Sequence, residues 1–217
     1  EGGAGPVPGP GDIARLSLLH PVNTATNIAL TVSGTQAIQR LDRTQAQTYS
    51  VTGGTLIITG ATAGIDDADY GTIAVGALSS GGGQTARPLT IASNIELAGD
   101  NLGFVANWKD AAITFSGVIS SAPGNSGVTF FSDARDGNNG RGMVISGTNT
   151  YAGNTTIIGQ IIFTNDLAFS GNGTPNNRTV TWKNDPNRND DGNLILGNGR
   201  NFSYHLALDP VYETGED

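Results

Sequence analysis

The sequence predicts an all-β fold, in which a single parallel β-solenoid of about seven or eight coils forms the body of the chain. Pairs of apolar residues recur at alternate positions, as on a strand with one buried and one wet face. Gly and Asn, which tolerate the positive φ of a corner, separate these pairs. Strong helix formers are few, since Lys is found only at positions 109 and 183. Gly reaches 32 of 217 residues without the every-third-residue period of collagen.

The stretch from Gly142 to Phe163 carries the alternation most clearly. Ser146-Gly147 and later Gly159 interrupt it, and after each interruption the apolar residues return to the same parity. We therefore expect a strand that turns corners without reversing through a hairpin, as in one coil of a solenoid. The residues on the predicted buried face are Met143, Ile145, Tyr151, Thr155, Ile157, Ile161 and Phe163.

A known repeat resembles this stretch. Residues 145–157 read Ile-Ser-Gly-Thr-Asn-Thr-Tyr-Ala-Gly-Asn-Thr-Thr-Ile, followed by Gly-Gln-Ile-Ile-Phe. This run is similar to the autotransporter-associated β-strand repeat, and residues 88–95 and 113–120 are similar to it more loosely. Gln160 stands where the repeat usually has Thr, and Gly153-Asn154 stands where it has a Gly pair.

The resemblance implies a right-handed parallel β-helix from a secreted bacterial surface protein. This family is defined mainly by structure and export, so the resemblance supplies no catalytic residues. The chain starts at Glu1 without an initiator Met or a signal peptide, as expected of a mature or processed form. The translocating C-terminal barrel of an autotransporter is also absent from the sequence, so we expect a released piece or a free-standing protein.

The N-terminal part differs in composition from the rest. Residues 1–12 hold three prolines and five glycines, which predict an extended arm. A neighbouring subunit is one candidate for holding such an arm in place. We expect residues 13–48 to form an N-terminal cap or strands that are exchanged with a neighbouring subunit. Within them, residues 36–47 fit a short helix or a strand, and we favour the strand.

Residues 13–208 form the predicted solenoid domain, and residues 209–217 form an acidic tail. From Tyr49 onward the spacing of the apolar pairs is irregular, which solenoids tolerate because insertions lie at corners. The predicted inward pairs are Leu56/Ile58, Ile73/Val75, Leu89/Ile91, Ile95/Leu97, Ile113/Phe115, Val128/Phe130, Met143/Ile145, Ile161/Phe163, Val180/Trp182, Leu194/Leu196 and Leu206/Leu208.

Charge and composition exclude several function classes. The net charge is −8, and a nucleic-acid-binding protein needs a basic surface that this sequence lacks. The same acidity disfavours binding to anionic membranes, and no apolar run reaches the roughly 18 residues of a membrane span. The chain has no Cys, which excludes disulfides, thiolate metal sites and a Cys nucleophile.

Most aromatic residues lie late in the chain, at a period of two, which is typical of core packing. A sugar-binding platform is the alternative interpretation. Trp108 and Trp182 are its best candidates, because Lys109-Asp110 and Lys183-Asn184 beside them are expected to be exposed.

Residues that carry chemistry are sparse. His20 and His205 are the only imidazoles, and neither has Ser and Asp neighbours that would indicate a triad. The loop at residues 185–192 has the alternate oxygen spacing of a calcium loop, but Asn198 stands where a bidentate Glu is needed. The loop at residues 133–140 is also acidic. We interpret both loops as solvated turns.

A polysaccharide-cleaving β-helix needs clustered carboxylates, or carboxylates plus a basic residue, on one face. Asp133, Arg135, Asp136 and Arg141 are close in sequence but lie in a corner-like loop. We therefore predict no catalytic, cofactor-binding or metal-binding residues, and no cofactor.

The predicted function is a non-enzymatic extracellular structural protein, secreted to the bacterial cell surface, whose subunits associate into a filament or matrix. Solenoid ends expose unpaired strand edges, and such edges are templates for pairing. We therefore expect self-association, with the N-terminal arm as one route, and no partner among nucleic acids or membranes. The alternative is an autotransporter-type passenger or adhesin fragment that binds glycans or cells. A polysaccharide-active enzyme is a minor alternative.

Overall fold

The computed structural model describes residues 7–16, 27–43, 48–60, 72–76, 88–99, 102–107, 113–123, 127–132, 143–159, 161–168, 179–183, 194–196 and 205–209. Every regular element in these ranges is a β-strand, and every strand pair is parallel. The all-β prediction is confirmed for this part of the chain. The same ranges contain no helix of the length and apolarity that crossing a bilayer requires.

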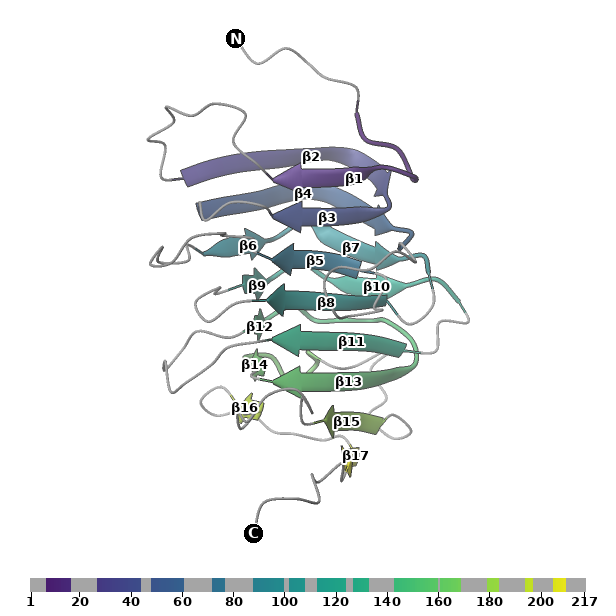
Figure 1. The fold of residues 1–217 in the computed structure, drawn as a ribbon, viewed down its shortest axis with the longest axis vertical. Helices are drawn as coiled ribbons and strands as arrows, with labels where there is room; N and C mark the ends of the chain where they lie inside the picture. Colours follow the sequence, from purple (N-terminus) through teal and green to yellow (C-terminus); the bar gives the residue numbers. More distant parts are fainter. Residues whose placement is uncertain are drawn as a thin grey trace.

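The strands stack side by side along the long axis of the molecule, with the N-terminal strands at one end and the C-terminal strands at the other (Figure 1). The sheet that contains β2 has nine described strands, and we call seven of them the first column. A short branch of this sheet continues from the second half of β4 through β7 (Asn94–Leu97) and β10 (Ile119–Ser121). The first column runs through β2 (Asn27–Ile38), β4 (Thr48–Ile58), β6 (Leu89–Ile91), β9 (Ile113–Phe115), β12 (Met143–Ile145), β14 (Ile161–Phe163) and β16 (Leu194–Leu196).

The remaining strands form the second column. β1 (Ile13–Leu16) pairs with β3 (Arg40–Arg43), and β3 contacts the first strand of a six-stranded sheet. The six-stranded sheet runs through β5 (Thr72–Gly76), β8 (Leu102–Asn107), β11 (Gly127–Ser132), β13 (Asn154–Gly159), β15 (Thr179–Lys183) and β17 (His205–Asp209). From β1 to β17 the chain alternates between the two columns, except that the branch strands β7 and β10 come between β6 and β8 and between β9 and β11.

Parallel register stacks apolar side chains of successive strands on one another between the columns. Where a side chain is described, each predicted inward pair is buried, except that Trp182 is half-buried. All these pairs lie on strands, which confirms the predicted alternation. One continuous register line, which we call the Leu30 line, consists of Leu30, Val51, Ile91, Phe115, Ile145, Phe163 and Leu196.

Aromatic rings fill the middle of this core. The rings of Phe104 and Phe130 stack at a centroid distance of 5.2 Å, and Phe104 meets Phe115 edge-on at 4.7 Å. Tyr151 tilts against Phe130 at 6.4 Å, and its hydroxyl shares a 2.6 Å hydrogen bond with the hydroxyl of Thr155. Such ring pairs add to the stabilisation that area burial provides.

The segment around residues 142–163 follows the predicted parity. Tyr151, Thr155 and Ile157 are buried, β13 ends at Gly159, and Gly153 has the positive φ expected at a corner (83°). Residues 36–38 and 40–43 are in strands β2 and β3, so the preference for strand over helix is confirmed for them.

Close backbone approach accounts for the glycine at another corner. The backbone N–H of Ser146 donates to the carbonyl of Phe115, and the N–H of Ser116 donates to the carbonyl of Ile91, each at 2.9 Å. Because the same hydrogen bond recurs at both levels, the corner after β12 lies directly against the corner after β9. A Cβ on Gly147 would lie 2.1 Å from the carbonyl oxygen of Gly117, so only glycine fits. Gly147 is therefore needed for space and not for a positive φ, in contrast to the reason expected from sequence.

A Gly147→Ala variant is expected to lower the free energy of unfolding by about 1–3 kcal/mol, because its Cβ meets backbone that has to shift. Urea denaturation followed by circular dichroism measures the change. Gly11→Ala is the matched control, since a Cβ there has nothing within 4 Å. Equal stability of the two variants would contradict the close-approach explanation.

Asn149 is the polar residue that joins three successive levels of the stack. Its side chain is 2% exposed. Its Oδ1 accepts a hydrogen bond from the backbone N–H of Ile119 at 2.8 Å, and its Nδ2 donates to the carbonyl of Ala168. Its own N–H donates to the carbonyl of Leu167 at 3.1 Å. The amide thus satisfies buried backbone groups where strand pairing beyond β10 gives way to irregular chain.

Replacing Asn149 with Ala is expected to cost about 3 kcal/mol, because it leaves a buried donor and a buried acceptor without partners. Thermal and urea unfolding measure this loss. Asn94→Ala is the control: the Oδ1 of Asn94 also accepts from a backbone N–H, that of Val118, at 3.1 Å, but Asn94 is exposed and water can replace it. A loss at Asn149 no larger than at Asn94 would refute this role.

Candidate interaction surfaces at the two ends of the stack

Most residues that the sequence offered for chemistry lie outside the described ranges. These include His20, Trp108, Asp133, Arg135, Asp136, Arg141 and the loop at residues 185–192. His205 begins β17, and only its backbone is described. Among the described residues, no group of three or more His, Cys, Asp or Glu side chains gathers as a metal site would require.

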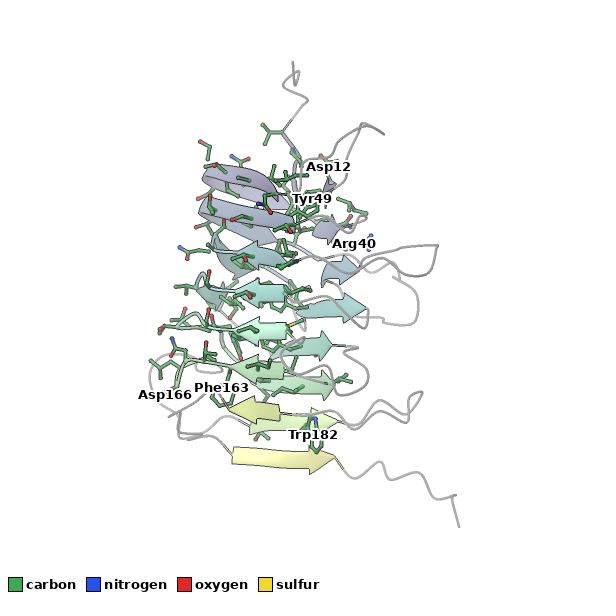
Figure 2. All side chains as sticks on the ribbon, turned by 90° about the vertical axis from the view of Figure 1, so that its left-hand side faces the viewer. Asp12, Arg40, Tyr49, Phe163, Asp166 and Trp182 are labelled. Carbon is green, nitrogen blue, oxygen red and sulfur yellow. The ribbon has the colours of Figure 1, made fainter. Side chains whose placement is uncertain are left out.

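Trp182 does not form the exposed platform that its sequence neighbours indicated. It is half-buried and packs against the core, and its indole N–H is buried with no hydrogen-bond partner among the described residues. Its register neighbours are Ile157 on β13 and Leu208 on β17. Figure 2 shows Trp182 near the C-terminal end of the stack. The core-packing interpretation is therefore confirmed for Trp182, Phe130, Tyr151 and Phe163.

Packing of Trp182 in the core predicts a protected indole. In a Trp108→Phe variant, where Trp182 is the single tryptophan, emission is expected to lie to the blue of free tryptophan. Acrylamide quenching should be weak until the protein is unfolded in urea. Strong quenching of the folded variant, or quenching by added oligosaccharides, would restore the platform interpretation.

The N-terminal end exposes the edge of a long strand. β2 spans 12 residues, and β4 is its only strand partner in the described part of the chain. Seven of its residues are exposed, four are half-buried and one, Ile38, is buried. A long edge strand carries a row of unpaired N–H and C=O groups and is a template for pairing with another chain.

The same edge exposes the end of the apolar core. Leu30 is 38% exposed, whereas Val51, Ile91, Phe115, Ile145 and Phe163 below it on the Leu30 line are 3% exposed or less. Leu30 thus has an inward register position but no strand above it among the described residues. Removing this side chain from water would stabilise a docked partner by about 25 cal/mol per Å² of apolar area.

β1 and the residues before it cover part of the N-terminal end. Gly9 to Asp12 form a turn, with the N–H of Asp12 donating to the carbonyl of Gly9 at 2.9 Å. The N–H of Gln39 donates to the carbonyl of Asp12 at 2.9 Å, and the hydroxyl of Thr59 donates to the carbonyl of Pro10 at 2.8 Å. This part of the arm is therefore bound to its own chain. Figure 2 shows Asp12 beside the end that carries β1 and β2.

The C-terminal end is formed by β16 and β17. In the described residues, β16 pairs only with β14, and β17 pairs only with β15. By register, Leu194 and Leu196 follow the buried Ile161 and Phe163, while Leu206 and Leu208 follow Val180 and Trp182. The last strand of each column therefore has leucines at the register positions that hold core residues in the strand before it.

The lateral surface of the second column has a different character. Thr129, Thr156 and Thr181 are in register on successive strands, and each is half-exposed. The alternation of the strands turns these hydroxyls away from the core. The side of the stack is thus polar here, and the exposed large apolar side chain on a described strand is Leu30, at an end.

Leu30 and Asn149 are two residues whose roles the sequence interpretation missed. Asn149 has the same parity as the inward residues Ile145 and Tyr151, and this spacing was the signal in the sequence that its side chain is buried. Leu30 has the parity of Ile28 within a run that does not resemble the repeat, so its place on the core line became visible only from strand register.

Comparisons with models of known families, with curated proteins and with solved structures found no match to this chain.

Proposed function

We propose that this chain is a non-enzymatic structural protein of the bacterial cell surface, a right-handed β-solenoid whose subunits associate end to end into a filament or matrix. Parallel pairing at every described ladder supports the solenoid, and so does the alternation between two columns, which the branch strands β7 and β10 interrupt. Among the described residues the first column has seven strands, which agrees with about seven coils. Crossovers between parallel strands are right-handed in nearly all proteins, which supports the handedness.

The exposed end of the Leu30 line carries the functional proposal. Leu30 begins this line at one end and Leu196 closes it at the other. When a second copy docks its β2 on β16, the same register continues and brings Leu30 next to Leu196. A contact between two different surfaces of identical subunits repeats without closing, and it therefore produces an open fibre.

The location at the cell surface rests on the resemblance of residues 145–163 to the autotransporter-associated repeat. The acidic composition and the absence of cysteine agree with a secreted protein but do not distinguish it from others. Expression with an epitope tag in the source cell, followed by surface labelling, tests this location independently of association.

An autotransporter-type passenger or adhesin is the second proposal. The observation that favours it is the line of outward threonines on β11, β13 and β15, a polar lateral surface on which a glycan or cell-surface ligand could bind by hydrogen bonds. A glycan array and a cell-adhesion assay on monomeric protein distinguish it from the structural role. No described residue favours the enzymatic alternative.

The test of end-to-end association is a Leu30→Lys variant. Lysine at this position places a charge at the end of the apolar line and should prevent a second copy from docking. Sedimentation velocity and electron microscopy over a range of concentrations are expected to show assemblies for the parent protein and monomers for the variant. Because the chain carries a net charge of −8, an added positive charge reduces repulsion between copies and cannot by itself explain a loss of assembly.

Thr31→Lys is the matched control, because it changes the adjacent exposed residue of the same strand with the opposite parity. It should assemble as the parent does. A parent protein that stays monomeric at high concentration, or a Leu30→Lys variant that assembles normally, would overturn the end-to-end proposal.

A further inference from the structure

The N-terminal end of the stack holds one strand more than end-to-end docking can accommodate. Each first-column strand is followed in the chain by a second-column strand, directly or after one branch strand, from β2 and β3 down to β16 and β17. β1 is the exception: it lies in the second column, and no described first-column strand precedes it. It occupies the edge of β3 that faces away from β5 (Figure 1).

This extra strand creates a competition when a second copy docks. If β2 of the second copy continues the first column from β16, its β3 comes to the position next to β17 of the first copy. That edge of β3 is already paired with β1 of its own chain over residues 13–16. One edge of one strand can hold only one ladder of backbone hydrogen bonds.

We propose that β1 is an exchangeable edge cap, which pairs with β3 in the free subunit and is displaced by β17 of the preceding subunit when two copies associate. This exchange rests on the proposed end-to-end association. It identifies β17 as the partner strand and β1 as the element that regulates the association. The occupant of the uncovered edge is a second copy of this chain, in a parallel strand pairing that continues the second column.

The two competing strands have compatible patterns. β1 presents Ala14 and Leu16 to the core, of which Ala14 is half-buried and Leu16 is 7% exposed. β17 has Leu206 and Leu208 at the register positions of Val180 and Trp182, both of which pack on the core. A leucine in place of Ala14 buries more apolar surface, so the exchanged pairing favours the assembly over the free subunit.

The cap is fastened by few contacts. β1 has four residues. Besides its ladder and the core packing of Ala14 and Leu16, the described contacts are the hydrogen bonds that Asp12 and Pro10 accept from Gln39 and Thr59. A short strand held in this way protects the edge from pairing and can still be released as a unit. Association should consequently begin slowly and show a lag that shortens as the protein concentration rises.

A reversible lock tests the exchange in the full-length chain. Ala14 and Leu41 are register partners on β1 and β3. Neighbouring parallel strands lie about 4.8 Å apart, which is within the Cα separation of roughly 4.4–6.8 Å that a disulfide spans. Because the natural chain contains no cysteine, an Ala14→Cys/Leu41→Cys variant has a single possible intramolecular disulfide.

The oxidised and reduced forms of this double variant both lack Leu41, so a difference between them reports the disulfide and not the loss of the leucine. Reduced protein should assemble after a lag, and oxidised monomer should stay monomeric by light scattering and electron microscopy. Equal assembly of the oxidised and reduced forms would overturn the exchange while leaving end-to-end association intact. Monomers in both redox states, together with a monomeric parent, would instead defeat the proposed function and the exchange with it.

A Leu16→Ala variant gives a readout that a purely structural strand would not give. Loss of this buried side chain weakens docking of β1, and assembly should then start roughly tenfold sooner or more. Slower assembly than the parent would show that β1 belongs in the assembled form and would refute the exchange. Circular dichroism of the monomer verifies that the variant remains folded, and Leu16→Met, which conserves volume, should restore the parent lag.

Discussion

Parallel register between successive strands is the constraint on which the rest of this structure depends. It aligns residues that are far apart in sequence, so that each strand places its inward side chains directly over those of the strand before. Every level therefore needs apolar residues at the same two or three positions, while the chain between levels is free to vary in length. Burial of the core is shared between neighbours, so no single level would be stable alone.

That constraint explains where polar and small residues are needed. A corner at which two levels approach closely has room only for glycine, as at Gly147. Where regular strand pairing stops beyond β10, buried backbone groups need another partner, and the amide of Asn149 supplies it. Both features occur between Gly142 and Phe163, the stretch in which the sequence alternation is clearest. The Gly and Asn residues of this stretch can therefore be understood as packing and hydrogen-bonding requirements.

The sequence predicted the strands well because alternation directly reports the burial of one strand face. Pairs such as Ile113/Phe115 and Ile161/Phe163 were placed correctly for this reason. It could not predict which strand would lie beside which, since parallel partners are separated by variable lengths of chain. The inward position of Leu30 and the bridging role of Asn149 both follow from that pairing. Trp182 was assigned to an exposed platform as the alternative because Lys183 follows it, but adjacent residues on a strand face opposite sides.

The branch formed by β4, β7 and β10 has a consequence for any assembly. Strand pairing in the branch stops at β10, so the described N-terminal levels have three strand-bearing sides and the later ones have two. The two extremities consequently differ in outline, and neither can substitute for the other. A fibre made from such subunits would be directional, with chemically distinct tips, and it would elongate at unequal speeds from its two tips.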